Sequence, residues 1–273
     1  MTRAELDISA GRAAFGEDPA AYHAARPPYP DALFEVLKQR CGLGPGVAVL
    51  EIGPGTGIAT ERLLAAGARP LLAIEPDLRL AAFVERRLGS ASLDVLRASL
   101  EDAQLPQAVF DLGVAATSFH WLDQASALAK TKTALRHGGW WAMWWTNFGE
   151  EGWPDPFQAA TRHLFVDTPR SPAHGRKGRP PFALDREARL ADLAAAGFAD
   201  AEVDYWRWTL TMETSRLCAL YATYSPVQAL PPTKRAAFLA DLAAIADRDF
   251  GGAVERPFST ILYTARRPGK SST

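Results

Sequence analysis

The sequence predicts an α/β protein with a doubly wound parallel sheet, and two observations lead to this fold class. In the first half of the chain, short apolar runs rich in β-branched residues alternate with stretches of helical periodicity. Strands and helices alternating in this way form βαβ units, whose right-handed crossovers place helices on the faces of a parallel sheet. The first apolar run also ends in a glycine-rich turn, residues 53–57, which leads directly into a helical stretch. A strand, a tight turn and a helix in this order favour a ligand site at the edge of such a sheet.

The elements of the first half follow one another in a regular order. Residues 31–41 have helical periodicity behind Asp31, whose side chain we expect to cap the helix. Further helices are expected at residues 60–66, 78–88 and 122–136, the last of them ending at His137-Gly138-Gly139. Strands are expected at residues 47–52, 70–74, 92–97, 110–116 and 140–146, as the short apolar runs of a buried parallel sheet.

The pattern changes after Asn147. Six prolines fall between residues 147 and 182, so part of this stretch must be loop, with a short helix expected at residues 157–165. The remaining expected elements are a helix at 186–196, a strand at 201–211, helices at 214–224 and 233–248, and a closing strand at 259–266.

Composition and charge narrow the classes of partner. The 273 residues carry 30 basic and 31 acidic side chains, for a formal net charge of -1. This balance gives no support to a nucleic-acid or membrane partner, since both require a local basic excess. Cys41 and Cys218 lie far apart and form no CxxC pair, so we expect reduced thiols and no metal site. No secretory signal or membrane-spanning run is recognisable, and a cytoplasmic protein is expected.

The glycine-rich turn is the most specific motif in the chain. Its sequence is VLEIGPGTG, residues 49–57, with glycine at every second position from Gly53 to Gly57 and Glu51 just before them. A dinucleotide fingerprint, GxGxxG, would need a glycine where the chain has Ile58. Glu51 would also repel a pyrophosphate and suits a cationic ligand better. No GK[ST] follows, so the turn is not a P-loop.

An acidic residue ends the second expected strand. Glu75 lies in LLAIEPD, directly after residues 70–74. A carboxylate at this place can accept hydrogen bonds from both hydroxyls of an adenosine ribose. The turn and Glu75 together therefore predict a ligand that contains adenosine. Two structural alternatives stay open, namely a tight turn that holds no ligand and a Glu75 that only caps the next helix.

The turn and Glu75 resemble the first two motifs of the class I S-adenosylmethionine-dependent methyltransferases. RASLEDAQLP, residues 97–106, is similar to that family's adenine-binding turn. FDLGVAATSFHWLD, residues 110–123, resembles the fourth strand and following turn of its type 11 branch, and RHGGWWAM resembles the opening of its fifth strand. YHAARPPYP, residues 22–30, resembles a lead-in segment that folds over the cofactor. The resemblance runs from residue 22 to about residue 143.

This resemblance implies a fold, a cofactor and a set of contacts. The fold would be a Rossmann-like, seven-stranded, mostly parallel sheet with an antiparallel last strand and helical cap insertions, and the cofactor would be S-adenosyl-L-methionine. Residues 53–57 would line its methionine and ribose portion, Glu75 would bind the ribose, and Ser99–Glu101 would hold the adenine, with Asp102 as an alternative contact. The cofactor-binding residues that the resemblance implies are Glu51, Gly53, Pro54, Gly55, Thr56, Gly57, Glu75, Pro76, Ser99, Leu100, Glu101, Thr117, Trp121, Tyr22 and Arg26.

His120 is the candidate catalytic residue. It would lie near the methyl donor, where an imidazole can act as a general base. A packed, hydrogen-bonded ring and a contact to cofactor or substrate are open alternatives. Six of the eight tryptophans fall between Trp121 and Trp153. We expect most of those on strand 140–146 to be sheet core and only one or two to reach a pocket.

The whole chain, residues 1–273, is expected to form a single methyltransferase domain. Residues 1–30 would be an N-terminal lid segment that places Arg26 and Tyr29 above the cofactor. Residues 147–182 and 213–250 would be cap insertions, because both follow strands whose ends or neighbours should border the pocket.

The expected function is S-adenosylmethionine-dependent methylation of a small organic acceptor, through an O-, N- or C-nucleophile or a carboxylate. A base is needed only if the nucleophile loses a proton during attack, and a carboxylate needs none. Two other classes stay open: a nicotinamide-dependent oxidoreductase on the same sheet, and a non-catalytic cofactor-binding protein.

Overall fold

The computed structural model describes residues 5–6, 16–148, 152–174 and 178–269. The strands are β1 (Val49–Ile52), β2 (Leu71–Ile74), β3 (Leu93–Leu96), β4 (Phe110–Ala116), β5 (Leu135–Asn147), β6 (Ala199–Glu213) and β7 (Ala253–Arg266). They form a seven-stranded sheet in the order β3-β2-β1-β4-β5-β7-β6. Strands β1 to β5 pair in parallel, whereas β7 runs antiparallel to both β5 and β6. The predicted Rossmann-like, mostly parallel sheet with an antiparallel last strand is confirmed.

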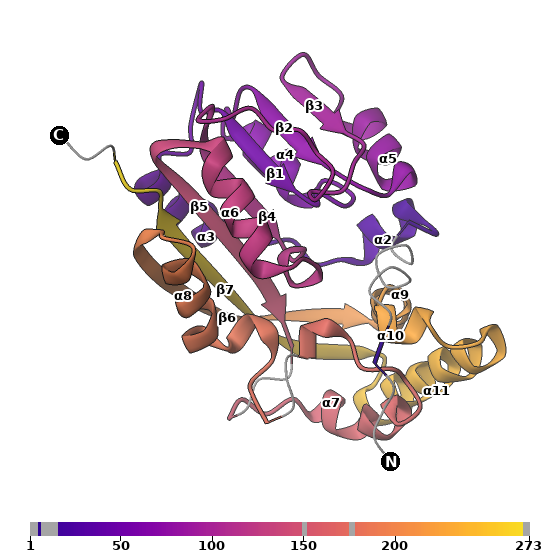
Figure 1. Cartoon of the computed structure of the whole chain (residues 1–273). Coiled ribbons are helices and arrows are strands. Elements are labelled where there is room, and N and C mark those ends of the chain that lie inside the picture. Colours follow the sequence, from indigo (N-terminus) through magenta and orange to yellow (C-terminus); the bar gives the residue numbers. More distant parts are fainter. Residues whose placement is uncertain (1–4, 7–15, 149–151, 175–177, 270–273) are drawn as a thin grey trace.

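Helices cover both faces of this sheet (Figure 1). The α-helices are α2 (Pro19–Ala25), α3 (Asp31–Cys41), α4 (Ile58–Ala65), α5 (Leu78–Leu88), α6 (Gln124–Ala134), α7 (Pro156–Thr161), α8 (Arg186–Ala195), α9 (Thr214–Ala222), α10 (Ser225–Gln228) and α11 (Pro232–Phe250). Short 3-10 turns are η1 (Phe119–Trp121), η2 (Arg162–Phe165), η3 (Pro172–His174) and η4 (Phe182–Leu184). One apolar core joins the sheet to α6 and α8, and a second joins it to α3, α4 and α5. The two cores make this part of the chain a three-layer α/β fold.

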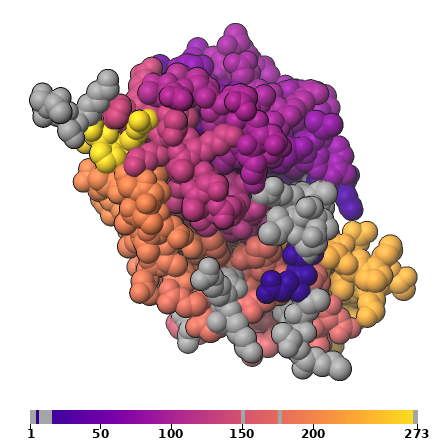
Figure 2. All heavy atoms as spheres, in the orientation of Figure 1, coloured from indigo at the N-terminus to yellow at the C-terminus, as the bar shows by residue number. Residues whose placement is uncertain are grey.

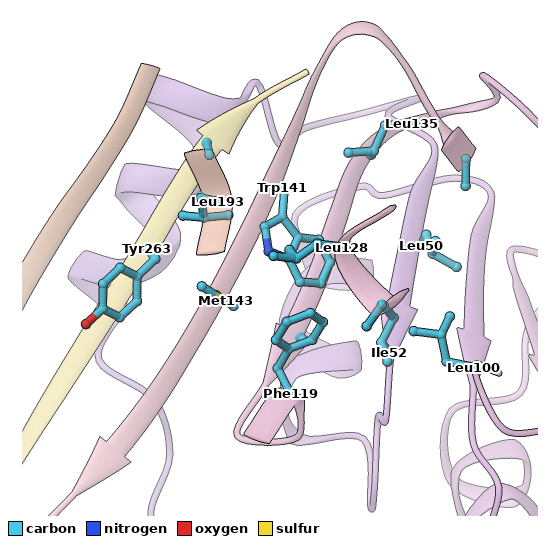
Figure 3. Close-up of a cluster of buried hydrophobic side chains, with 14 of the residues drawn as sticks. Leu50, Ile52, Leu100, Phe119, Leu128, Leu135, Trp141, Met143, Leu193 and Tyr263 are labelled. Atoms are coloured by element: carbon cyan, nitrogen blue, oxygen red, sulfur yellow. The ribbon is translucent and has the colours of Figure 1, made fainter. Parts of the chain in front are cut away.

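The tryptophans of β5 divide between these two cores. Trp141 and Trp145 belong to the core with α6 and α8, and Trp144 belongs to the opposite one, as the two-residue period of a strand requires. In Figure 3 the indole of Trp141 lies close to Leu128 and Phe119, and the Phe119 ring centroid is 5.1 Å from it. On the neighbouring strand, a Cβ at Gly113 would lie 3.0 Å from a ring carbon of Trp141. Glycine at this position therefore makes room for the indole.

The β6–β7 hairpin is longer than the sheet that it completes. β5 pairs with β7 from Trp140↔Arg266 to Asn147↔Ser259, whereas β6 and β7 remain paired as far as Glu213↔Ala253. The hairpin therefore extends past the parallel strands. Helices α9, α10 and α11 connect its two strands and pack with α7 in a third apolar core (Figure 1). In Figure 2 the purple N-terminal half lies at the top of the molecule and the orange C-terminal segments lie below it.

Two local predictions are wrong. β5 begins at Leu135, inside the predicted helix end, because Leu135 pairs with Phe110 ahead of a register irregularity between β4 and β5. Asp31 is not a helix N-cap: it is the first residue of α3, behind Pro30. Its carboxylate instead pairs with Arg62 at 2.5 Å. An acidic residue is favourable near the positive end of a helix both at the N-cap and in the first turn. The sequence pattern alone therefore does not distinguish the two positions.

The predicted lid, residues 1–30, and the first predicted cap insertion, residues 147–182, lie partly outside the described residues. Within the described ranges, no helix has both the length and the apolar character needed to cross a bilayer. In the same ranges, no cluster of three or more His, Cys, Asp or Glu side chains is arranged to hold a metal ion.

Candidate functional site

A cavity of about 2040 Å³ lies at the carboxyl ends of β1, β2, β4 and β5. In doubly wound sheets, ligands bind at this edge, where the strand order reverses, here between β1 and β4. Ligand pockets commonly measure roughly 300–1,000 Å³. The cavity is therefore large enough for two small ligands side by side.

Most of the residues expected from the sequence line this cavity. Those that do are Gly53, Pro54, Gly55, Thr56, Glu75, Pro76, Ser99, Leu100, Glu101, Thr117, Trp121, Tyr22 and Arg26, together with His120 and Tyr29. Glu51 and Gly57 are not among the lining residues. The chain thus brings four motifs, far apart in sequence, to one wall.

The glycines of the turn have the backbone conformation that only glycine adopts freely. Gly53, Gly55 and Gly57 have φ values of 67°, 59° and 82°, in the left-handed region. A Cβ at Gly53 would lie 2.7 Å from the Cβ of Ser118, whereas a Cβ at Gly55 would meet nothing within 4 Å. The Ser118 hydroxyl donates to the Ile52 carbonyl at 2.6 Å. Gly53 is therefore needed for the close approach of the two turns, and Gly55 leaves open space beside the backbone.

Glu75 holds the glycine-rich turn in place. One carboxylate oxygen, Oε2, accepts from the Gly55 N–H at 3.0 Å, and the other, Oε1, accepts from the Asp77 N–H at 3.0 Å. The side chain is buried and borders the cavity. Since a carboxylate oxygen has two lone pairs, each can also accept from a ligand hydroxyl.

Glu51 lies behind the turn and is fully buried. Burial is the main reason that the pKa of Glu51 is raised to about 7; the negative charge of Glu75 raises it further, and the nearby Thr60 hydroxyl lowers it. Both carboxylate oxygens of Glu51 lack a partner in hydrogen-bonding geometry among the described residues. Glu51 therefore belongs to the buried interior behind the turn and not to the wall of the cavity.

The turn after β3 presents Ser99, Leu100 and Glu101 to the cavity. Asp102, the alternative adenine contact, is instead tied to Ser99: it accepts from the Ser99 hydroxyl at 2.7 Å and its N–H donates back to that oxygen at 3.1 Å. Leu100 is buried. This turn therefore offers an apolar side chain flanked by a polar one, which suits the face and edge of a planar base.

His120 lines the cavity with one ring nitrogen already engaged. The indole Nε1–H of Trp145 donates to His120 Nδ1 at 3.0 Å. Burial, together with the nearby positive charge of Arg26, lowers the pKa of His120 to about 3. The ring is also flanked by Trp121 and Phe182, with centroids at 5.0 and 6.1 Å. His120 is therefore a neutral, well-positioned imidazole.

The N-terminal segment is bonded to the turns beneath it. His23 Nδ1 lies 3.2 Å from the Thr56 hydroxyl, and the Tyr29 hydroxyl lies 3.1 Å from that of Thr117. Thr117 has a φ of 56°, a strained conformation for a β-branched residue. Helix α2, which carries His23, was not predicted from the sequence, because its seven residues have no distinct apolar stripe.

The other side of the cavity is aromatic and was largely missed by sequence reasoning. Phe148, Tyr221 and Tyr224 line it, and the Phe148 and Tyr224 rings stack with centroids 4.9 Å apart. Beneath them Arg256 forms a buried ion pair with Asp155 at 2.9 Å and a hydrogen bond to the Tyr221 hydroxyl. No local motif marks these residues, because they meet only through the packing of the β6–β7 hairpin.

The match to a known family falls on the half of the chain that contains the motifs. Residues 50–143 match the family model described as a methyltransferase domain. The match confirms the family resemblance read from the sequence.

Relatives among curated proteins match over part of their length. An uncharacterized methyltransferase of Schizosaccharomyces pombe is 26% identical over 134 residues, which cover 48% of this chain and 51% of that protein. A ribosomal RNA small subunit methyltransferase of Arabidopsis thaliana is 36% identical over 87 residues, which cover 30% of this chain and 24% of that protein. The chain spans about half the length of the fission-yeast relatives that it matches.

Solved structures resemble the chain over most of its length. A protein of Anaeromyxobacter dehalogenans, assigned as a type II methyltransferase, has a TM-score of 0.62 at 23% identity and covers 89% of this chain and 99% of its own. The [4+2]-cyclase SpnF has a TM-score of 0.59 at 18% identity, covering 98% and 100%. Phosphoethanolamine N-methyltransferase 2 of Haemonchus contortus, in complex with S-adenosylhomocysteine, has a TM-score of 0.57 at 12% identity, covering 93% and 57%. At these identities the likeness shows the fold alone.

Proposed function

We propose that this chain, whose residues 50–143 match a methyltransferase domain, transfers a methyl group from S-adenosylmethionine to a small organic acceptor. One observation carries the proposal: a single cavity is bordered by the glycine-rich turn and Glu75 on one side and by the aromatic residues around the β6–β7 hairpin on the other. A methyl transferase needs both ligands within one enclosed space, because the reaction is a direct displacement.

The cofactor side of this cavity fits S-adenosylmethionine in three respects. The open space beside Gly55 lets a ligand approach the backbone closely. Glu75, with its two oxygens oriented by backbone N–H groups, would accept the ribose hydroxyls. Ser99 and Leu100 would hold the adenine. When bound, the cofactor supplies an electrophilic methyl group on a sulfonium.

The chain would promote transfer mainly by alignment and by exclusion of water. Thr117, His120 and Trp121, at the end of β4, border the region between the two sides of the cavity. Fixing an acceptor there in line with the methyl group replaces a bimolecular encounter with an oriented one. The aromatic side, with the stacked Phe148 and Tyr224, offers apolar surface against which a bound acceptor would exclude water from the reacting atoms.

We also propose the assignment of the segments outside the matched domain. Residues 1–30 would act as the N-terminal lid segment, since Tyr22, Arg26 and Tyr29 line the cavity. Residues 147–182 and 213–250 would form the cap that selects the acceptor, because both contribute lining residues on the aromatic side. In this proposal the chain, residues 1–273, is one catalytic unit.

Isothermal titration calorimetry tests the proposal directly. We expect S-adenosylmethionine and S-adenosylhomocysteine to bind and NAD not to bind. Binding of NAD alone would favour the oxidoreductase alternative. Binding of S-adenosylmethionine without turnover on any member of a broad acceptor panel would favour a non-catalytic protein.

Glu75→Gln gives the sharper test of the cofactor site. It replaces one carboxylate oxygen with an NH2 group, which can donate but cannot accept, so we expect affinity for S-adenosylhomocysteine to fall by at least about tenfold, or roughly 1.4 kcal/mol. Glu85→Gln is the matched control, because Glu85 is paired with Arg97 on the surface and does not line the cavity. Unchanged affinity in a folded Glu75→Gln protein would contradict the ribose assignment.

A further inference from the structure

We propose that Arg26 and His120 bind the reacting group of the acceptor, and that this group is a negatively charged oxygen, a carboxylate or a phenolate. The proposal rests on the function proposed above and names the acceptor class for the same site. Three features of the chain lead to it: a histidine with a fixed tautomer, an arginine with no carboxylate partner, and the placement of the acids around the cavity.

The bond from Trp145 fixes the tautomer of His120. An indole nitrogen can only donate, so His120 Nδ1 must accept and cannot carry the ring hydrogen. A neutral imidazole then carries its hydrogen on Nε2. No described residue bonds Nε2, and the ring lines the cavity. His120 therefore offers an N–H donor to a ligand, and it has no free lone pair with which to take a proton.

Arg26 lines the same cavity, and no carboxylate of the described chain pairs with it. Its guanidinium lies 4.6 Å from the centroid of the Tyr22 ring and 5.5 Å from that of Tyr224. One nitrogen, Nη2, donates to the Thr223 carbonyl at 3.3 Å. Aromatic rings and a neutral carbonyl hold the side chain in position without neutralising it. A fixed guanidinium that no carboxylate of the described residues neutralises, beside an apolar cavity, is a site for an anion. The family resemblance places Arg26 on the cofactor, whose methionine carboxylate is the competing anion. A fall in S-adenosylhomocysteine affinity in Arg26→Met, with the acceptor preference unchanged, would favour the cofactor carboxylate.

Four acids border the cavity, namely Glu75, Asp77, Glu101 and Asp167, and three of them are engaged with other residues. Asp77 is paired with Arg79 at 2.6 Å, and Asp167 is paired with Lys234 at 3.3 Å. Glu75 accepts from the glycine-rich turn. Glu101 lies in the turn after β3, on the side of the cavity assigned to the adenine. Burial and the positive charge of Arg26 lower the pKa of His120, and no carboxylate is among the charges that shift it. Among its described residues, the site therefore offers no base to an acceptor that must lose a proton during attack, whereas an acceptor that binds as an anion needs none.

The remainder of the acceptor is expected to be apolar or aromatic. Phe148, Tyr224 and Trp145 border the cavity around Arg26 and His120. Side chains of this kind bind carbon skeletons through buried area and leave orientation to a few polar groups. The acceptor class is therefore an organic acid or an acidic phenol with an apolar body.

The reaction of such an acceptor balances without any proton transfer. The acceptor oxygen donates an electron pair to the methyl carbon, an O–C bond forms, and the C–S bond breaks with its electrons remaining on sulfur. A carboxylate becomes a neutral methyl ester, a phenolate becomes a neutral methyl ether, and the sulfonium becomes a neutral thioether. Arg26 then no longer faces an anion, so the product is held less tightly than the substrate, which favours release.

Calorimetry on the full chain saturated with S-adenosylhomocysteine tests the acceptor class by binding rather than by turnover. The probes are matched in skeleton: octanoate, octanol and octylamine, then cinnamate, cinnamyl alcohol and cinnamylamine, with naphthol at acid and alkaline pH as the phenolate arm. We expect at least one carboxylate, or the ionised naphthol, to bind at least about tenfold more tightly than its neutral and cationic counterparts. Tight binding of a carboxylate probe would indicate a carboxylate site, and tight binding of ionised naphthol would indicate a phenolate site. Amines or alcohols that bind as tightly, or no anion that binds, would overturn the proposal.

A substitution of Arg26, with a matched control, tests whether this residue causes the preference for anions. Arg26→Met should remove the preference for the anion over its neutral counterpart. Arg62→Met should keep that preference, because Arg62 stacks on Phe34 at 4.4 Å outside the cavity. The preference is a ratio measured within one variant, so a general loss of cofactor or acceptor affinity cancels. A preference retained in Arg26→Met would overturn the role of Arg26.

The tautomer of His120 has its own readout. Nitrogen NMR of the side chains should show His120 with its hydrogen on Nε2. In Trp145→Phe the two tautomers should mix and the anion preference should fall by about threefold or more, as expected for loss of an oriented donor. Trp141→Phe is the control, because the Trp141 Nε1–H has no partner among the described residues. A hydrogen on Nδ1 in the unmodified protein would overturn this step. Failure of S-adenosylhomocysteine to bind at all would instead refute the proposed function.

Discussion

In the half of the cavity that faces the parallel strands, the walls are backbone turns, whereas in the half that faces the β6–β7 hairpin they are side chains from distant segments. Gly53, Gly55 and Glu75 act through φ values and backbone hydrogen bonds. Phe148 and Tyr224 act through the faces of their rings. A wall made of backbone groups has a fixed shape that side-chain substitutions alter little. A wall made of side chains changes its shape and chemistry with each substitution. In the proposed function, the first half would recognise the constant cofactor and the second half would select the acceptor.

The largest effect should come from the ion pair that supports the aromatic half. The side chains of Asp155 and Arg256 are each 1% exposed, and Oδ2 of Asp155 lies 2.9 Å from Nη2 of Arg256. Asp155→Ala leaves the guanidinium buried without its partner, so the free energy of unfolding should fall by about 3–5 kcal/mol in urea titrations. Asp167→Ala removes an exposed pair with Lys234 and should cost less than about 1 kcal/mol. Equal losses would mean that the buried pair does not support this half.

The next largest effect is a pH dependence of the free energy of unfolding, caused by Glu51, the buried acid behind the glycine-rich turn. The pKa of Glu51 is raised from 4.5 to about 7, so the folded state holds a proton that the unfolded state releases. The stability that this proton contributes is fully present below pH 4.5 and is lost as the pH rises to 7. Over that range the unmodified protein should lose roughly 3 kcal/mol relative to Glu51→Gln, by the free energy of the pKa shift.

Urea titrations of both proteins from about pH 4 to about pH 8 measure this difference, with the slope given by proton uptake. Glu85→Gln is the control, because Glu85 lies on the surface. A constant difference between the unmodified protein and Glu51→Gln across this range would show that Glu51 is ionised in the folded state.

Gly53→Ala tests whether the cofactor half depends on close backbone approach. The new Cβ would meet Ser118 at 2.7 Å in a left-handed conformation, so we expect a loss of about 2–3 kcal/mol from strain and overlap together. Gly46→Ala shares the positive φ, 80°, but meets nothing within 4 Å and should show the strain alone, about 1 kcal/mol. Thermal unfolding compares the two. Similar losses would mean that the contact with Ser118 yields easily.

The smallest effect is expected where the N-terminal segment meets the turns. Tyr29→Phe removes the hydrogen bond to Thr117, 3.1 Å long, and should cost about 0.5–1.5 kcal/mol of unfolding free energy. Tyr205→Phe is the control, since its hydroxyl has no partner among the described residues and its removal should be close to neutral. If both substitutions are neutral, the Tyr29–Thr117 bond does not anchor this segment.

Sequence reasoning worked well where function depends on neighbours along the chain. The turn at residues 53–57 and Glu75 could be recognised because the end of a strand, a glycine-rich turn and a terminal acid are local features. The start of β5 could not, because Leu135 becomes a strand residue only through its pairing with Phe110 on another element. Likewise, the acid at residue 31 showed where α3 begins but not that its partner would be Arg62.

By itself, the sequence determined the fold class and the position of the expected cofactor contacts, because periodicity and turn chemistry are properties of short segments. Only the tertiary structure decided that the Trp145 N–H is bonded to His120, that Arg26 lies between two tyrosine rings, and that Glu51 stands behind the turn. These facts concern contacts between residues from different elements, and they depend on side-chain packing that no local pattern records. The same packing brings β6, β7 and their connecting helices over the cavity, where the acceptor is expected to be chosen.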